Sequence, residues 1–92
     1  MGRTDITIVV DFHATWCGPC KTLFPRLEER INKKAGKAIL FKVDIDQHQA
    51  IAGSVEIPGV PAVFMIKGGE MVDNFVGSVD DAKLDAFFEK IE

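Results

Sequence analysis

The stretch Trp16-Cys17-Gly18-Pro19-Cys20 holds both cysteines and the only tryptophan of the chain. A nearly continuous apolar, β-branched run, Ile6–Phe12, comes before it and predicts a strand that is covered on both faces. A helix from Gly18 to about Ala35 is predicted after it, because apolar side chains recur there at four-residue spacing. Two thiols three positions apart at the start of a helix can close a small disulfide ring, and the helix amides favour a thiolate on the first. We therefore interpret the pair as suited to reversible dithiol–disulfide exchange.

The composition is that of an ordinary globular protein, with 47% apolar and 27% charged residues among 92. This length predicts one domain, residues 1–92. The net charge of -3 gives no reason to expect nucleic acid or an anionic membrane as a partner, and no apolar run approaches the roughly 20 residues that span a bilayer. The start of the chain resembles neither a signal peptide nor an Arg-rich presequence, so we expect an intracellular chain or a mature form. Two cysteines in one Cys-x-x-Cys motif indicate a redox pair, not a disulfide scaffold.

Three further strands are predicted after the first helix, each from a short run rich in apolar residues: Ala38–Val43, Ala62–Ile66 and Met71–Val76. The helix between the first two strands implies a right-handed parallel βαβ unit. Gly68-Gly69 predicts a tight antiparallel hairpin between the last two strands.

Two more helices complete the predicted fold. One is a short helix at about Gln47–Gly53, capped by Asp46, and the other follows a capping box at Ser78–Asp81. The last helix is expected to bury an apolar stripe formed by Leu84, Phe87, Phe88 and Ile91. We therefore predict an α/β fold, a minimal four-stranded mixed sheet that lies between helices and is flanked by three of them. The cysteine pair follows a parallel strand, at the end of the sheet where α/β proteins usually place their sites.

Several segments together resemble the thioredoxin family. The central segment is Val9–Lys21, in which Trp-Cys-Gly-Pro-Cys-Lys follows the upstream Asp11. Four shorter segments match in the same order: Lys42–Asp46, Gly59–Pro61, Gly68–Glu70 and Phe75–Gly77. The resemblance runs from about Ile8 to the C-terminus and implies the thioredoxin fold. Asp11–Ala14 and Val72–Gly77 look most like the corresponding segments of mitochondrial thioredoxins.

One departure from the family concerns the start of the chain. Family members usually have an extra strand and helix before the strand that corresponds to Ile6–Phe12, whereas about five residues precede that strand here. In the family, the extra strand pairs with the equivalent of Ala38–Val43. We therefore expect an open edge at Ala38–Val43, a partly bare sheet face, and self-association through this edge or reduced stability.

The resemblance implies separate roles for the two cysteines. Cys17 would attack a substrate disulfide, and the more buried Cys20 would then attack Cys17 and release the reduced substrate. The residues alone leave two alternatives, a pair of structural thiols or two zinc ligands. Zinc needs four ligands, and His13 and His48 are too few and wrongly spaced to complete a site, so we expect no metal.

Asp11 stands in a strand that should be buried, where a carboxylate needs a partner and its pKa rises. The resemblance implies that Asp11 accepts the proton of Cys20 through water, with Lys42 nearby on the adjacent strand. The alternative is a strand-end carboxylate that reaches solvent. His13 is near enough to influence these titrations, although a lone histidine is more often simply packed or solvated.

The resemblance also implies a cis peptide bond at Pro61 and a trans bond at Pro58, with an ordinary trans loop proline as the alternative at Pro61. A cis bond would turn the Val60 backbone outward beside Cys17, where an extended substrate can pair with it. For Trp16, core packing is the alternative to a contact surface. An apolar rim for protein contacts is expected around Cys17, formed by Trp16, Gly18, Pro19, Gly59, Val60, Pro61 and Gly77.

The function that the resemblance implies is that of a protein-disulfide reductase of the thioredoxin type. Its partners would be disulfide-containing proteins and a flavoprotein thioredoxin reductase supplied by NADPH, and the chain itself would bind no cofactor. A disulfide oxidase or isomerase on the same fold is a second hypothesis, although Gly18-Pro19 between the cysteines favours the reductant. A third is a redox-dependent binding module in which turnover is incidental. The mitochondrion is the expected location, with the cytosol as the alternative.

Overall fold

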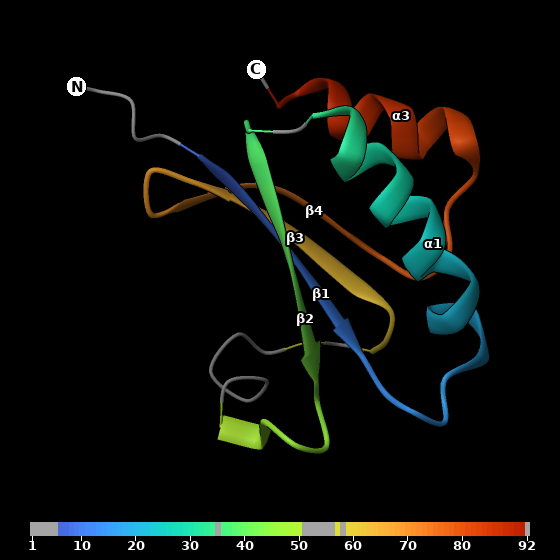
Figure 1. Ribbon diagram of the computed structural model, residues 1–92. Coiled ribbons are helices and arrows are strands. Elements are labelled where there is room, and N and C mark those ends of the chain that lie inside the picture. The colour runs from blue at the N-terminus through green and yellow to red at the C-terminus, as the bar shows by residue number, and fades with distance from the viewer. Residues whose placement is uncertain (1–5, 35, 51–56, 58, 92) are drawn as a thin grey trace.

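The computed structural model describes residues 6–34, 36–50, 57 and 59–91, which form a four-stranded sheet and two complete helices (Figure 1). The elements follow one another in the order β1 Thr7–His13, α1 Gly18–Lys33, β2 Ala38–Asp44, β3 Ala62–Lys67, β4 Glu70–Val76 and α3 Asp81–Glu89. All four predicted strands are present, and each boundary lies within one residue of its prediction. Neither helix has the length and apolar character needed to cross a membrane.

The strands lie in the order β2-β1-β3-β4. β1 and β2 run parallel, with Asp11 opposite Lys42, whereas the other two pairings are antiparallel. This confirms the predicted mixed sheet. Parallel neighbours need a crossover connection, which α1 supplies, so α1 begins close to the C-terminal end of β1. The turn between them is closed by the Cys17 amide, which donates to the Ala14 carbonyl at 3.1 Å.

The hairpin between β3 and β4 turns at Gly68 and Gly69, as predicted. Both residues have positive φ angles, 62° and 81°. A two-residue hairpin loop needs this left-handed geometry to match the twist of its strands, and glycine adopts it without steric cost.

The hydrophobic core lies on one face of the sheet, where both complete helices pack. Leu23 and Leu27 of α1 are fully buried, and the predicted stripe at the end of the chain is confirmed, since each of its members is at most 4% exposed. These side chains form one cluster with a row from the sheet: Val9, Val63 and Met65. The expectation of a sheet between helices is not met in the described part of the chain, because α1 and α3 lie side by side on the same face (Figure 1).

Two details of the helix predictions need correction. Part of the short helix expected at Gln47–Gly53 falls on residues outside the described ranges, and among the described residues helical geometry begins at Gln49, two positions later than expected. At α3 the N-cap is Asp80, whose Oδ1 accepts the Lys83 amide at 2.8 Å. The capping box expected from Ser78 is therefore wrong by two residues. Serine and aspartate cap almost equally well, so the composition of this segment does not choose between them.

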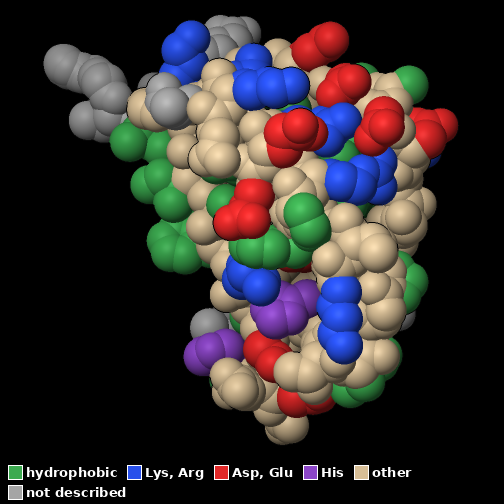
Figure 2. Space-filling model, turned by 45° about the vertical axis from the view of Figure 1, so that its right-hand side comes forward, with side chains coloured by type: hydrophobic (Ala, Val, Ile, Leu, Met, Phe, Trp, Pro, Cys, Tyr) green, Lys and Arg blue, Asp and Glu red, His purple; other side chains and the backbone are tan. Residues whose placement is uncertain are grey.

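Ion pairs connect α1 to the segment around α3. Arg26 Nη2 donates to both the Val79 carbonyl and Asp81 Oδ1 at 2.8 Å, and Arg30 Nε donates to Asp85 Oδ1 at 2.8 Å. Basic and acidic side chains accordingly alternate over this side of the molecule (Figure 2). The carboxylates are well exposed, so these pairs orient the two helices more than they stabilise the fold.

The opposite face of the sheet retains exposed apolar side chains. Ile39 and Phe41 of β2 are 45% and 52% exposed. β2 also forms an edge of the sheet, with β1 as its one strand neighbour among the described residues. The open edge and the partly bare face expected from the sequence are therefore both present in this part of the chain.

Candidate active site at the cysteine pair

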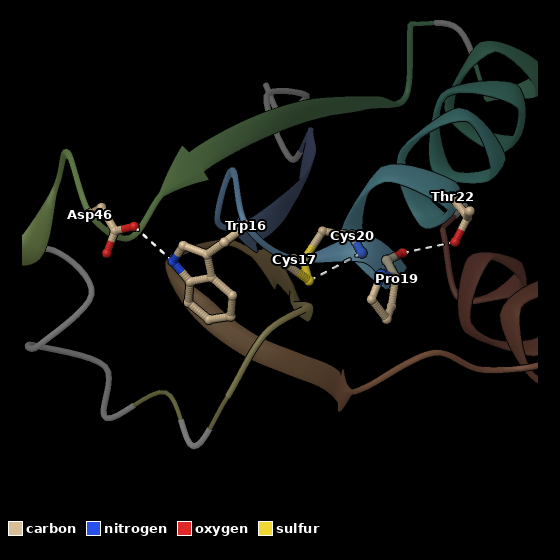
Figure 3. The surroundings of a disulfide bond; sticks show 6 residues. All are labelled: Trp16, Cys17, Pro19, Cys20, Thr22 and Asp46. Carbon is tan, nitrogen blue, oxygen red and sulfur yellow. Dashed lines mark hydrogen bonds between the residues drawn. A yellow bond between two sulfur atoms is a disulfide. The ribbon is translucent and has the colours of Figure 1, made fainter.

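The two cysteines form a disulfide immediately after the turn that follows β1. Their Cα atoms are 5.3 Å apart, and Cys17 is the N-cap residue of α1 (Figure 3). Cys17 and Cys20 are each 4% exposed, so the expectation that Cys20 is the more buried is not met. Both lie in one turn and pack into one small cluster with Ala14, which explains why their side chains are equally buried. Position in the helix, and not burial, distinguishes the two sulfurs.

Cys17 Sγ lies where a negative charge is best accommodated. It accepts the backbone N–H of Cys20 at 3.2 Å, an interaction that Figure 3 shows as a dashed line. The first turn of α1 contains no acidic residue, so nothing there opposes the positive end of the helix dipole. Once the disulfide is reduced, this environment favours a thiolate at Cys17.

Asp11 is buried next to the pair and has no polar partner among the described residues. Its side chain is 1% exposed, and neither carboxylate oxygen accepts a hydrogen bond. Burial raises the pKa of Asp11 to about 6, against a smaller opposing effect of the Lys42 charge. The alternative of a strand-end carboxylate that reaches solvent is therefore wrong. A carboxyl group that titrates near neutrality is suited to exchanging a proton with a thiol.

Lys42 influences Asp11 from a distance. The two residues are opposite each other in the β1–β2 pairing, yet no ion pair joins them within the described structure. Lys42 Nζ instead lies 3.8 Å from the centre of the Phe24 ring, in a cation–π contact with α1. The proximity of Lys42 to Asp11 was predictable from the pairing of their strands, whereas the contact of Lys42 with Phe24 was not, because it depends on how α1 packs.

A cavity of about 510 Å³ joins these groups. Its walls come from the end of β1, the first turns of α1 and the middle of β2. The lining residues are Asp11, His13, Ala14, Thr15, Cys20, Lys21, Phe24 and Lys42. Cys20 therefore borders the same space as the buried carboxyl group, which gives water a route between its sulfur and Asp11.

Trp16 forms an exposed surface beside the disulfide. It is 67% exposed, which excludes the alternative of core packing. Its indole Nε1 donates to Asp46 Oδ2 at 3.0 Å, so one edge of the ring is tethered to the turn after β2 (Figure 3). Asp46 was expected to cap a helix, and this bond between residues 30 positions apart was not predicted. An aspartate just beyond a parallel strand end was the one available signal, because such ends converge at the site.

The loop before β3 completes the rim around the disulfide. The Val60–Pro61 peptide bond is cis, as predicted, whereas Pro58 lies outside the described residues. Val60 packs against the cysteine cluster. Pro61 is fully buried, so its ring adds no exposed surface to the expected rim. The backbone N–H of Gly77, just after β4, donates to the Pro61 carbonyl at 2.7 Å.

The glycines of the predicted rim leave open space above the backbone. A Cβ atom placed on Gly18, Gly59 or Gly77 would meet no atom within 4 Å. Pro19 is exposed beside Gly18 at the start of α1. Because these positions carry no side chain, the backbone of another chain can come close to them. Within the described ranges, no group of three or more His, Cys, Asp or Glu side chains is arranged to hold a metal ion.

Comparisons with known proteins agree on one family. Residues 2–90 match the model of the family described as Thioredoxin. Thioredoxin, mitochondrial, from Mus musculus is 50% identical over 89 residues, which cover 97% of this chain and 54% of that protein. Probable thioredoxin-2 from Caenorhabditis elegans is 43% identical over 89 residues, covering 97% and 61%. The crystal structure of the germline-specific thioredoxin Deadhead from Drosophila melanogaster has a TM-score of 0.88 at 29% identity, covering 97% of this chain and 84% of that one. The chain spans about half the length of the first curated relatives that it matches.

The raised pKa of Asp11 predicts that replacing this residue stabilises the oxidised protein at high pH. An unfolded aspartate ionises near 3.8 and the folded one near 6, so the unfolded chain releases its proton first and stability falls as the pH rises between these values. We expect Asp11→Asn to raise the free energy of unfolding at pH 8 by on the order of 3 kcal/mol, and by only a small fraction of that at pH 4. Urea unfolding of both oxidised proteins measures this difference.

Glu28→Gln is the matched control, because Glu28 is exposed on α1 and its replacement should change stability little at either pH. A gain for Asp11→Asn that is the same at pH 4 and pH 8 would contradict the assignment of a raised pKa.

Proposed function

The chain belongs to the thioredoxin family, and from that premise we propose that it is a thiol–disulfide oxidoreductase that reduces disulfides in proteins. The observation that carries this proposal is the Cys17–Cys20 disulfide at the start of α1, bordering a cavity that contains the buried Asp11. A thiolate-favouring helix N-terminus supplies the nucleophile, and a carboxyl group with a pKa of about 6 supplies the proton acceptor.

The proposed reaction runs in two exchange steps. The Cys17 thiolate attacks one sulfur of the substrate disulfide, a new S–S bond forms, and the other substrate sulfur leaves with the electron pair and takes a proton from solvent. Cys20 then passes its proton through water to Asp11 and attacks Cys17 Sγ. The Cys17–Cys20 bond forms, and the second substrate sulfur leaves as a thiol after it is protonated. Two electrons and two protons pass from the cysteine pair to the substrate.

The rim around the disulfide is the proposed contact surface for the substrate. Trp16 offers an exposed aromatic face, and the segment Gly59–Val60 is half-buried beside the cysteine cluster. We propose that an extended substrate segment pairs with the Val60 backbone, while Gly18 and Gly77 let its main chain come close.

The partners that follow from this reaction are disulfide-containing proteins and an NADPH-dependent thioredoxin reductase that restores the dithiol. Family membership supports both assignments. We also propose a mitochondrial location, which the 50% identity to a mitochondrial thioredoxin of Mus musculus supports, with the cytosol as the alternative. Subcellular fractionation with an antibody against the chain tests the location.

Replacing Cys20 should trap the first exchange step. In Cys20→Ser, Cys17 still attacks a substrate, but no second thiol resolves the mixed disulfide, so substrates remain covalently attached. We expect a series of dithiothreitol-sensitive adducts on non-reducing gels after incubation with disulfide-containing proteins. The matched control, Cys17→Ser, should form none of them, because it lacks the nucleophile at the helix N-terminus.

The same pair of variants separates the reductase from a redox-dependent binding module. If the partners captured by the wild-type chain are retained equally by the double variant that lacks both sulfurs, covalent exchange is not the basis of recognition and the binding module is the better description.

The reduction potential separates the reductase from an oxidase or isomerase. Thioredoxin itself has a well-known potential of about −270 mV, and protein disulfide isomerase about −180 mV. We expect the Cys17–Cys20 couple to titrate near the thioredoxin value in a thiol–disulfide buffer series read by Trp16 fluorescence. A midpoint near the isomerase value would contradict the assignment as a reductant.

We further propose that two copies of the chain associate through β2. Among the described residues this strand presents an open edge, and Ile39 and Phe41 form an exposed apolar row on it. Sedimentation velocity should show the wild-type chain dimerising at high concentration and Phe41→Lys remaining monomeric. The control is Val72→Lys on β4, where Val72 is similarly exposed at 49%. A wild-type chain that remains monomeric throughout would rule out this association.

A further inference from the structure

The proposed reaction requires protons to reach a buried place. Asp11 is 1% exposed, and neither of its carboxylate oxygens has a hydrogen-bond partner among the described residues. The cavity of about 510 Å³ that Cys20 and Asp11 both line offers a route by which a proton can move between solvent and Cys20. Water occupies about 30 Å³ a molecule in the liquid, so the cavity has room for several molecules.

His13 lies on the wall of this cavity next to Asp11. The two residues are two positions apart on β1, so their side chains project from the same face of the strand, and both line the cavity. The His13 side chain is more exposed than that of Asp11, because Asp11 is buried and His13 is only half-buried. His13 is therefore placed between the buried carboxyl group and the outside.

The other charged groups around the cavity do not offer the same chemistry. Lys42 of β2 and Lys21 of α1 carry hydrogen-bond donors only, and Lys42 is already engaged by the Phe24 ring. Asp44, which is opposite His13 in the β1–β2 pairing, is the remaining acidic neighbour.

Burial and the Lys42 charge hold the pKa of His13 below its ordinary value, against the opposing effect of Asp44. This shift favours the neutral imidazole over the imidazolium. A neutral imidazole accepts a proton on one nitrogen and releases a proton from the other.

We propose that His13 is a proton relay that connects solvent to the Asp11–Cys20 pair during disulfide exchange, an inference that rests on the proposed function. When a dithiol reduces the chain, its thiolate forms a bond to Cys17 Sγ, and the Cys17–Cys20 bond breaks. The Cys20 sulfur leaves with the electron pair and receives a proton that passes from solvent through His13, water and Asp11. The second dithiol sulfur then displaces Cys17, so that two electrons and two protons have passed to the pair.

This arrangement predicts that replacing His13 slows reduction of the disulfide by a factor that depends on pH. Below pH 6 the Asp11 carboxyl group itself holds the proton that Cys20 needs, so the relay is dispensable. Above pH 6 Asp11 is ionised, and each departure of Cys20 draws a proton through His13. A residue with only a structural role would slow the reaction equally at all pH values.

The test is the rate at which dithiothreitol reduces the oxidised chain, followed by Trp16 fluorescence between pH 5 and pH 8. We expect the rate of His13→Ala divided by that of the wild type to be near one at pH 5 and to fall about tenfold by pH 8. Added imidazole should restore the rate of His13→Ala at pH 8 and leave the wild type unchanged. His13→Gln, which keeps a polar side chain of similar size, should show the same pH-dependent fall in rate. This variant takes the place of His13→Ala in the test if the smaller side chain disturbs folding.

His48→Ala is the matched control, because His48 is exposed in the turn after β2 and does not line the cavity. Its rate ratio should stay near one at every pH. A flat ratio for both His13 variants, or a loss that imidazole does not restore, would overturn the relay and leave the proposed reductase intact. A wild-type chain whose disulfide dithiothreitol does not reduce at all would contradict the proposed function itself, and with it the relay.

Discussion

The parallel pairing of β1 with β2 is the constraint from which the site follows. Two parallel neighbours cannot be joined by a tight turn, so α1 must carry the chain back along the sheet. Its N-terminus therefore lies just beyond the end of β1, where the helix dipole and the unpaired amides meet the Cys17 sulfur. The same pairing places Lys42 opposite Asp11 and brings the turn that holds Trp16 close to the disulfide. The residues proposed as nucleophile and proton acceptor, and the Trp16 part of the proposed contact surface, thus owe their positions to one crossover unit.

Most of this framework could be predicted from the sequence because it depends on local signals. Strand and helix periods, the Gly68-Gly69 turn and the cysteine spacing are each encoded within a few residues. The details that were missed depend on tertiary contacts. The bond from Trp16 to Asp46 joins residues 30 positions apart, and the contact of Lys42 with Phe24 exists only once α1 has packed on the sheet.

The corrections have a related physical cause. Burial of a side chain depends on everything that packs around it, so sequence position alone did not show that the two cysteines are equally covered or that Pro61 is buried. Similarly, a nearly continuous apolar run indicates that a strand has two apolar faces but does not say which helix covers which face. In the described residues, α1 and α3 cover the same one, and Phe41 remains exposed on the other.

The side chains on the face of β1 that carries the site become less buried from Val9 to His13. Val9 lies in the dry core and is completely buried, Asp11 is 1% exposed at the margin of that core, and His13 is half-buried on the cavity wall. A carboxyl group placed at Val9 would have no water within reach, and one placed at the half-buried His13 would be desolvated less than Asp11 is, so that burial would raise its pKa less. The middle position is the one at which burial raises the pKa toward neutrality while a water-accessible cavity still adjoins the group. A gradient of burial along a single strand is therefore sufficient to place a carboxyl group with a pKa of about 6 on the cavity that Cys20 also lines, which is what the proposed proton transfer requires.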